Sequence, residues 1–374
     1  MLNGLTAEQL HAALAVLGVA PRAVRQLQMA AVRRRELPPS IPGIAGRVIA
    51  RVREHATIGR LELVTRVVSP QDGFTRYLFR GSGPDPFETI RIPLLHRPAD
   101  PKYVICVSSQ VGCALGCVFC ATGRLGFRRN LAAWEIVDQV AAVAAESPHA
   151  VGGVVFMGMG EPLLNYEAVM QAARILSEPT GMAIDGKAIT ISTAGIVPGI
   201  RRLAEERRPY RLVVSLTAAD PALRRALMPV EAQYPTAALL EALRDYHAAT
   251  RRRVTLAWPL IAGVNTRDRD AAQLAELTRG LPVKLDLIDI NDPAGGFRPP
   301  DRVELDAFRD ALRARLGAPV ARRYSGGQDI HAACGMLRGA PDSQHVGLRV
   351  VPRDAGQGGL ARPGGVAVDA PVGT

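Results

Sequence analysis

The spacing of apolar side chains changes from a helical to a strand-like period near residue 60. Before that point Leu10, Leu14 and Leu17 recur at helical spacing. Gly18 and Pro21 are expected to end this helix, and a proline-rich stretch separates two later ones. The pattern predicts a small helical unit with helices over about 5–17, 22–35 and 43–56.

The next stretch, 61–93, is rich in β-branched and aromatic residues, as strands are. It predicts three strands, at 61–68, 75–79 and 87–93, with a turn at Asp72-Gly73 between the first two. Glu88 lies in the third strand among apolar and β-branched neighbours. A glutamate in such a strand usually faces solvent, so spacing alone gives it no catalytic role.

From residue 103 to about 330, strand-like and helix-like segments alternate. The predicted strands are 103–108, 152–157, 188–192, 211–216, 254–260 and 283–290. The predicted helices include 132–146, 166–177, 197–206, 236–249 and 268–279. Repeated strand–helix units imply a parallel sheet with right-handed crossovers. Six such units suit an incomplete (β/α)6 barrel, with its active site at the carboxyl ends of the strands.

These changes of pattern predict an α/β chain with four regions. They are an N-terminal helical domain, a β-hairpin extension, a barrel core and a Gly- and Pro-rich tail expected to be disordered. Their bounds are 1–58, 59–100, 101–338 and 339–374.

The charge of the chain favours a polyanionic partner. The 374 residues include 46 Lys and Arg against 35 Asp and Glu, a net charge of +11, and neutralised phosphates release counterions. The arginine clusters are scattered, so each alone fits a solvated face or a composition bias, while together they favour RNA. The chain opens with no secretory pattern and has no apolar run of about 18 residues. A cytoplasmic protein without membrane association is therefore expected.

The most specific motif is a three-cysteine loop after the first barrel strand. Cys113, Cys117 and Cys120 have C-x3-C-x2-C spacing, and Cys106 stands seven residues earlier. Three thiolates are one ligand short of a full four-cysteine cage, so a bound [4Fe-4S] cluster keeps open positions on one iron. That iron suits chelation and reductive cleavage of S-adenosylmethionine (SAM), and the spacing is the signature of the radical SAM superfamily.

Three other interpretations of these cysteines are weaker. A zinc ribbon needs a second C-x2-C pair or histidines at ligand spacing, which the chain lacks. A structural disulfide is not expected without a secretory signal. Buried small apolar cysteines remain an alternative, but the loop directly follows an apolar strand-like run at 103–107.

Other candidate residues also follow predicted strands. The segment at Gly160-Glu161 lets a ligand approach the backbone and offers a carboxylate to the SAM amino group. Ser192 and the run Ser215-Leu216-Thr217 offer hydroxyls that fit a SAM carboxylate or ribose, or equally a helix N-cap. Asn291 ends the last strand and offers an amide to the nucleoside. Cys334, in an Ala-rich segment, is by default a buried cysteine.

Assembled, these segments resemble the dual-specificity radical SAM RNA methyltransferases, which methylate C2 of an adenosine in 23S ribosomal RNA and in some tRNAs. A sister group methylates C8 of the same rRNA adenosine. The likeness runs from about residue 5 to 338, and the matching segments are 106–123, 158–165, 191–195 and 332–335.

The resemblance implies a role for every cysteine. One SAM methylates Cys334, and a second SAM, cleaved at the cluster, gives a 5′-deoxyadenosyl radical that takes hydrogen from this methyl. The methylene radical adds to the adenine carbon, Glu88 accepts the ring proton, and Cys106 attacks the Cys334 sulfur to release methylated RNA. The implied SAM contacts are Gly160, Glu161, Ser192, Ser215, Leu216, Thr217 and Asn291. A low-potential donor such as flavodoxin is the implied partner, and a monomer is expected.

Three departures from the family pattern leave the substrate open. The usual Ser-Leu-His is here Ser215 to Thr217, the usual Pro-Phe-Asn-Pro type run is Asp289 to Pro293, and an acidic aromatic pair is replaced by Ala257 to Pro259. Adenosine C8, another RNA or a small heteroaromatic molecule stay alternatives. A non-catalytic cluster or RNA-binding protein is a further one, in which Cys106 and Cys334 would have no role.

Overall fold

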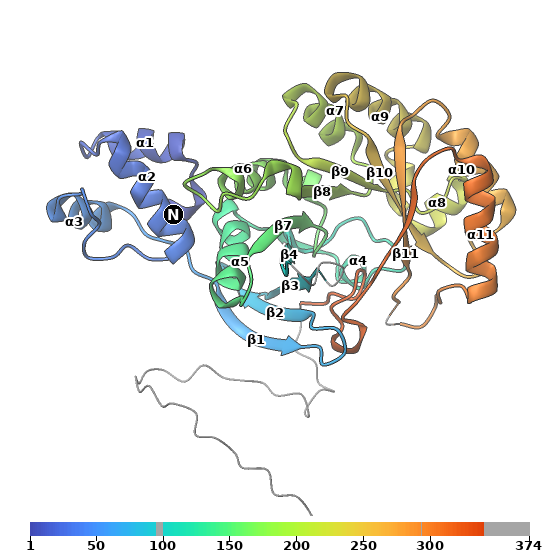
Figure 1. The fold of residues 1–374 in the computed structure, drawn as a ribbon, viewed down its shortest axis with the longest axis horizontal. Coiled ribbons are helices and arrows are strands. Elements are labelled where there is room, and N and C mark those ends of the chain that lie inside the picture. Colours follow the sequence, from blue (N-terminus) through green and yellow to red (C-terminus); the bar gives the residue numbers. More distant parts are fainter. Residues whose placement is uncertain (95–99, 293, 340–374) are drawn as a thin grey trace, which may run out of the picture.

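The computed structural model describes residues 1–94, 100–292 and 294–339. Within these ranges ten strands form one sheet, in the order β1-β2-β3-β4-β7-β8-β9-β10-β11-β12, and β5 pairs with β6 in a separate ribbon (Figure 1). Residues 340–374, nearly all of the expected disordered tail, lie outside the described residues. The strands are β1 Glu62–Val68, β2 Thr75–Arg80, β3 Phe87–Pro93, β4 Tyr103–Cys106, β5 Gln110–Gly112, β6 Phe127–Asn130, β7 Val151–Phe156, β8 Ile189–Thr193, β9 Arg211–Ser215, β10 Val254–Leu260, β11 Val283–Asp289 and β12 Val320–Arg323.

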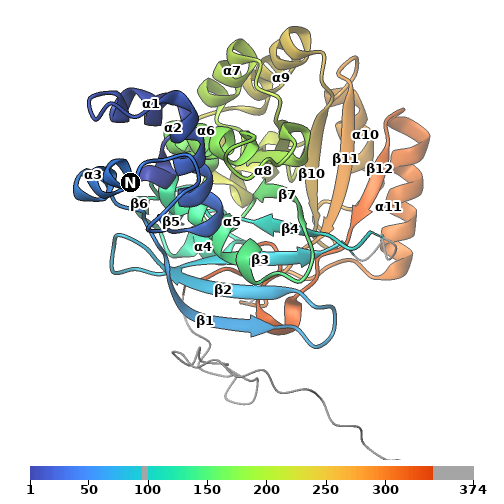
Figure 2. The ribbon, with the colours of Figure 1, turned by 60° about the vertical axis from the view of Figure 1, so that its left-hand side comes forward.

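The part of the sheet from β4 to β12 is parallel throughout. Helices connect its successive strands and lie outside the curve of the sheet (Figures 1 and 2), so the apolar faces of both meet in one large core. The connecting helices are α4 Ala121–Arg124, α5 Ala133–Glu146, α6 Tyr166–Ser177, α7 Val197–Glu206, α8 Pro221–Leu227, α9 Thr236–Thr250, α10 Asp268–Leu277 and α11 Arg302–Arg315.

The predicted α/β architecture, an incomplete barrel of six strand–helix units, is confirmed. Each of the six predicted strands forms within two residues of its expected bounds. The structure adds a seventh parallel strand, β12, on the far edge of the sheet. Its sequence, Val-Ala-Arg-Arg, carries no apolar run because an edge strand leaves part of its surface to solvent.

The N-terminal helices are α1 Ala7–Ala15, α2 Pro21–Met29 and α3 Gly46–His55, and they share an apolar cluster separate from the barrel core. Thr6 and Gln9 form a capping box at the start of α1. The sequence predicted that Pro21 would help to end this helix. Pro21 instead begins the next helix, α2, where the N–H group that proline lacks would have no partner within the helix. Arg35 pairs with the buried Asp138 of α5 at 2.7 Å and so fastens this unit to the barrel.

The first three strands extend the sheet as an antiparallel β1-β2-β3 unit that joins the barrel through β4. Ile90 of β3 stands opposite Cys106 of β4. Because paired residues share a face and side chains alternate along a strand, Glu88 lies on the same inner face as Cys106. Among the described residues, no helix is both long and apolar enough to cross a membrane.

A fully buried arginine ties two strand ends together. Arg224 of α8 donates to the carbonyls of Ala194 after β8 and Leu216 after β9, at 2.7 and 3.0 Å. Its charge is balanced by Glu231 at 2.5 Å, which also accepts from Thr236. The loops that carry these carbonyls border the cavity described below, so the ion pair fixes that rim.

Replacing Arg224 with Met should lower the free energy of unfolding by about 3–5 kcal/mol, because Glu231 then keeps a buried charge without a partner. Urea unfolding followed by circular dichroism measures the loss. Arg201→Met, which removes an exposed ion pair with Glu241, is the matched control and should change stability by less than about 1 kcal/mol. Equal effects of the two substitutions would contradict this account.

Candidate active site

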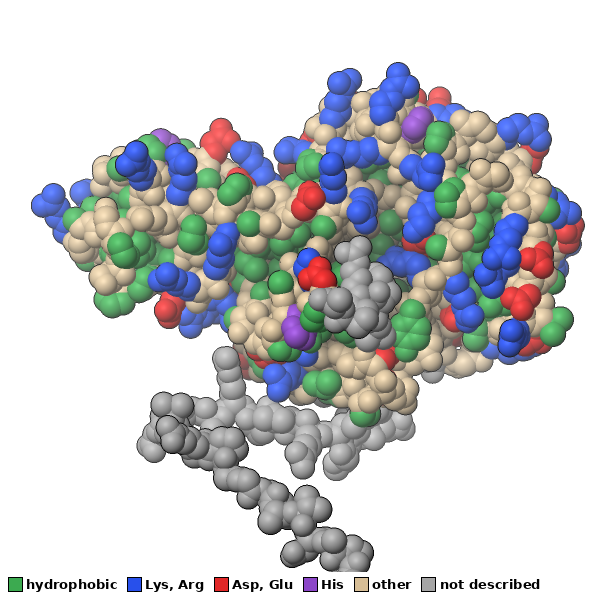
Figure 3. Space-filling model, viewed as in Figure 1, with side chains coloured by type: hydrophobic (Ala, Val, Ile, Leu, Met, Phe, Trp, Pro, Cys, Tyr) green, Lys and Arg blue, Asp and Glu red, His purple; other side chains and the backbone are tan. Residues whose placement is uncertain are grey.

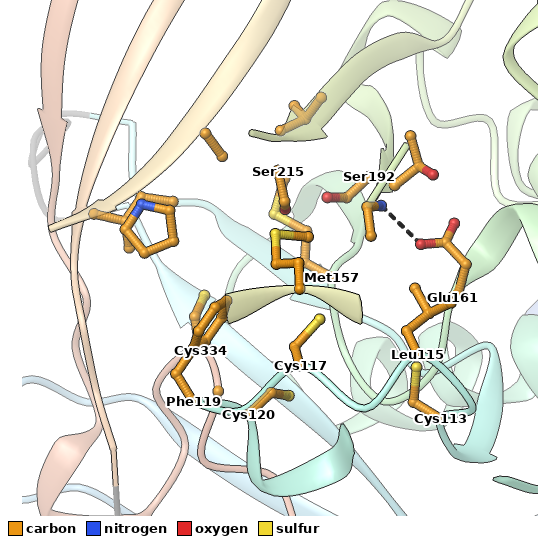
Figure 4. Close-up of a pocket in the computed structure, with 18 of the residues that line it drawn as sticks. Cys113, Leu115, Cys117, Phe119, Cys120, Met157, Glu161, Ser192, Ser215 and Cys334 are labelled. Atoms are coloured by element: carbon orange, nitrogen blue, oxygen red, sulfur yellow. Dashed lines mark hydrogen bonds between the residues drawn. The ribbon is translucent and has the colours of Figure 1, made fainter. Parts of the chain in front are cut away.

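The cluster loop lies at the carboxyl ends of the parallel strands, as predicted. Cys113, Cys117 and Cys120 come from the segment between the β5 strand and α4, and all three thiols line one cavity of about 200 Å³ (Figure 4). Gly112 makes the sharp turn into the loop with φ +70, and a Cβ there would stand 1.8 Å from the Gly126 carbonyl oxygen. Only glycine therefore fits at that position.

Burial disfavours ionisation of the loop thiols in the absence of a metal. It raises the pKa of Cys113 to about 12 and raises the pKa of Cys117 as well. A coordinated metal removes such thiol protons, so the donor set fits an iron–sulfur cluster better than three free thiols. The described residues contain no His, Cys, Asp or Glu group placed to hold a single metal ion, and in a cluster each thiolate binds a different iron.

Glu161 stands at the Cys113 end of the cavity, and Cys334 at the opposite end beside Phe119 (Figure 4). The Glu161 carboxylate accepts from the backbone N–H groups of Leu163 at 3.0 Å and Ala194 at 2.8 Å. Burial raises its pKa to about 7, although these N–H groups lower it. A buried carboxylate held in this way is suited to receive an ammonium group.

Gly160 allows Glu161 to take this position. Its φ is +95, and a Cβ there would stand 2.5 Å from the Cβ of Gln110. The Gln110 side chain in turn accepts from the Glu161 backbone N–H at 2.8 Å. No role for Gln110 could be predicted from the sequence, because a lone glutamine carries no recognisable spacing.

Most of the predicted SAM residues line the cavity, and two do not. Those that do are Gly160, Glu161, Ser192, Ser215 and Asn291. Leu216 packs into the barrel core, and Thr217 is fully buried with φ +65 and a hydroxyl group that lacks a hydrogen-bond partner among the described residues. A SAM contact by Leu216 or Thr217 stays a prediction that their positions do not support.

Cys334 links this cavity to a second, smaller one. The second cavity, of about 80 Å³, is mostly apolar and is lined by Cys106, Met157 and Cys334 among others. Cys334 is an exposed residue and lines both spaces, whereas Cys106 is only 6% exposed. Both cysteines are free thiols in this structure. The default expectation that Cys334 is simply buried is wrong.

Three hydrogen bonds fasten the segment around Cys334 to α4 and to Asn291. The carbonyl of Gly335 accepts from the Ala121 N–H, and that of Leu337 from the Thr122 hydroxyl, both at 2.8 Å and both on α4. The amide of Asn291 reaches the Cys334 carbonyl at 3.4 Å. The position of the Cys334 sulfur therefore depends on the helix that directly follows the cluster loop.

The position of Glu88 in its strand suggested that it faces solvent, but the structure buries it fully. One carboxylate oxygen accepts from Arg76 at 3.1 Å. The other accepts from the backbone N–H groups of Arg338 at 2.7 Å and Gly339 at 3.1 Å, just beyond the Cys334 segment. Glu88 lines neither cavity. Its expected role as proton acceptor therefore stays a prediction.

Comparisons with known proteins agree with this geometry. Residues 107–275 match the family model of the radical SAM superfamily. A probable RNA methyltransferase of an Anaeromyxobacter strain is 54% identical over 78% of this chain and 85% of its own. A probable dual-specificity RNA methyltransferase RlmN of Moorella thermoacetica is 42% identical over 90% of this chain and 96% of its own.

A solved structure supports the same assignment over nearly the whole chain. The crystal structure of a radical SAM methyltransferase from Sphaerobacter thermophilus has 40% sequence identity and a TM-score of 0.83, over 90% of this chain and 99% of that one. Sequence and fold therefore agree, and the chain belongs to the radical SAM RNA methyltransferases, the family that includes RlmN.

Proposed function

We propose that this RNA methyltransferase transfers a methyl group to C2 of an adenosine in 23S ribosomal RNA, and in tRNA as a second substrate, through a methylated Cys334. The observation that carries the proposal is the place of Cys334 at the junction of the two cavities. One sulfur atom there is reachable from the cluster and SAM side and also from Cys106.

As a radical SAM methyltransferase, the protein uses a [4Fe-4S] cluster and SAM. Cys113, Cys117 and Cys120 would hold the cluster, which together with SAM supplies the 5′-deoxyadenosyl radical. Glu161 would receive the SAM amino group, while Ser192, Ser215 and Asn291 would contact the rest of the molecule. A low-potential donor such as flavodoxin would provide the electrons.

The chain's own cysteines would carry the methyl group and release the product. Cys334 takes the methyl as a thioether, gives up one hydrogen atom from it and becomes joined through the remaining methylene to adenine, which would then lose its ring proton and return the unpaired electron to the cluster. Attack of the Cys106 thiolate on the Cys334 sulfur then forms a disulfide and breaks that sulfur–carbon bond, whose electron pair leaves with the methylene carbon and takes up a proton to give the methyl group. External electrons must reduce the disulfide before the next cycle.

The surface charge fits an RNA substrate bound over a broad area. On the face in Figure 3, Lys and Arg side chains outnumber Asp and Glu and extend from the N-terminal helices to the barrel. Basic residues spread in this way provide contacts to several phosphates but no base recognition. The N-terminal helices are the part of the chain proposed to contact RNA outside the active site.

The first experiment offers protein-free 23S rRNA and tRNA to anaerobically purified, cluster-loaded enzyme with SAM and reductant. Nucleoside mass spectrometry should detect 2-methyladenosine, and none with Cys334→Ala. Cys106→Ala should instead accumulate a covalent protein–RNA adduct, because the thiol that releases the product is gone. An 8-methyl product would move the enzyme to the sister group, and a methylated Cys334 with no methylated RNA would point to a different substrate.

Glu161→Gln should weaken SAM binding about tenfold, because a charge-assisted hydrogen bond contributes about 1.5–3 kcal/mol. The pKa of Glu161 is raised to about 7, so the ionised fraction of the carboxylate increases as the pH rises through that value. Wild-type affinity should therefore rise as pH increases through 7, and the Gln variant should lack this rise. Equilibrium dialysis measures both, with Glu167→Gln on the exposed face of α6 as the control. If Glu161→Gln showed the same pH dependence of SAM affinity as Glu167→Gln, a role for Glu161 would be contradicted.

Glu88→Gln should lower the yield of methyladenosine by at least about a hundredfold if Glu88 is the proton acceptor, the range typical of a lost general base. Formation of 5′-deoxyadenosine should persist, since that step precedes proton removal. Glu62→Gln, on the exposed strand β1, is the control. Full methylation by the Glu88 variant would exclude the role, and loss of both products would indicate a structural one.

A further inference from the structure

Cys106 faces a problem that the cluster cysteines do not. Its side chain lies in the apolar core, and burial raises the pKa of its thiol. The attack proposed for it requires a thiolate. Cys106 is not a proposed cluster ligand, so no metal removes its thiol proton. Another group must therefore stabilise the negative charge of the Cys106 thiolate.

The cavity that holds Cys106 contains one candidate for that group. Among the described residues that line it, Arg323 is the only Lys, Arg or His, and the others are mostly apolar. Arg323 comes from β12, the edge strand that the sequence pattern did not reveal. The Arg323 side chain is 38% exposed, so its charge keeps part of its hydration while the residue lines the same cavity as Cys106.

We propose that Arg323 is a positioning residue that stabilises the Cys106 thiolate and directs it at the Cys334 sulfur. This inference rests on the proposed function, since it concerns the step that releases the product. It names a residue for which neither the sequence motifs nor the comparisons give a role.

Two contacts fix the guanidinium beside the cysteines. Nη1 of Arg323 lies 3.7 Å from the Met157 sulfur, and Nε lies 3.8 Å from an Asp286 carboxylate oxygen. Met157 lines both cavities. Its backbone N–H donates to the Cys106 sulfur and lowers the pKa of that thiol, and the charge of Arg323 acts in the same direction. The N–H group and the charge come from different parts of the sheet, the residue that follows β7 and the strand β12.

The other charged or titratable groups around Cys106 do not supply a free positive charge. On its own face of the sheet, Glu88 is paired with Arg76. Cys334 raises the pKa of Cys106 when it is ionised. Tyr324 borders the cavity but donates its hydroxyl to Asp72 at 3.0 Å. Asp286 also binds Lys284 at 2.7 Å, so it neutralises Arg323 only in part.

The exchange step can be isolated from RNA and SAM. Brief treatment of the cluster-loaded enzyme with methyl methanethiosulfonate converts the accessible Cys334 to a methyl disulfide. The Cys106 thiolate then attacks the Cys334 sulfur, the new S–S bond forms, the bond to the methylthio group breaks, and its electron pair leaves as methanethiolate. Mass spectrometry after acid quench follows the intramolecular disulfide, and Cys106→Ala should not form it.

Arg323→Gln should slow this exchange about tenfold at neutral pH and move the midpoint of its pH profile upward by about one unit, because one pKa unit is a tenfold change in thiolate at a given pH. Arg322→Gln, which alters the neighbouring arginine bound to Asp289, is the matched control and should leave the profile unchanged. An unchanged profile in a folded Arg323→Gln protein would overturn the proposal.

Asp286→Asn tests independently whether more positive charge at Arg323 speeds the exchange, as the proposal requires. Removing the carboxylate that partly neutralises Arg323 should speed the exchange below the midpoint and move the profile downward. A purely structural role for Arg323 predicts slower exchange in both variants, and that result would also overturn the proposal. Because the assay uses neither RNA nor SAM, failure of the methylation experiment and failure of this one are separate outcomes.

Discussion

The chemistry of this site depends on sulfur atoms that must lose protons where charge is poorly solvated. Burial raises the pKa of Cys106, Cys113 and Cys117 alike. Iron in a bound cluster removes the protons of the loop thiols, but Cys106 lies in a separate apolar cavity. A partly hydrated guanidinium at the edge of that cavity meets the same need without the penalty of a fully buried charge.

The parallel sheet brings these groups together because all its strands end at one edge. Cys334 comes from the far end of the core, yet its segment is bonded to α4, directly after the cluster loop. Just beyond it, the N–H groups of Arg338 and Gly339 bind Glu88. A proton taken up by Glu88 would weaken those two bonds, so the predicted proton acceptor and the methyl carrier are linked through the backbone.

The features that could be predicted from the sequence are those with a regular period or a fixed residue spacing. The six barrel strands, the three-cysteine loop and the Gly160-Glu161 turn all follow from period and motif. Positions that depend on contacts across the sheet did not follow. Arg323 lies on a strand with no apolar run, so the strand itself was missed. Glu88 was expected to face solvent, because the period of a strand does not say which of its faces is covered. Gln110 contributes only through its hydrogen bond to the Glu161 backbone.

Two of the three departures from the family pattern are joined through one buried side chain, Asn265. Asn265 donates to the carbonyl of Thr217 at 2.8 Å, while its own carbonyl accepts from the Trp258 indole at 3.2 Å. Thr217 and Trp258 are both fully buried, and neither lines the cavity. The two departures are therefore coupled structurally through Asn265, while Ala257 and Pro259, on either side of Trp258, line the cavity itself. Asp292, which binds Arg124 of α4 at 3.1 Å, connects the third departure to the helix that follows the cluster loop.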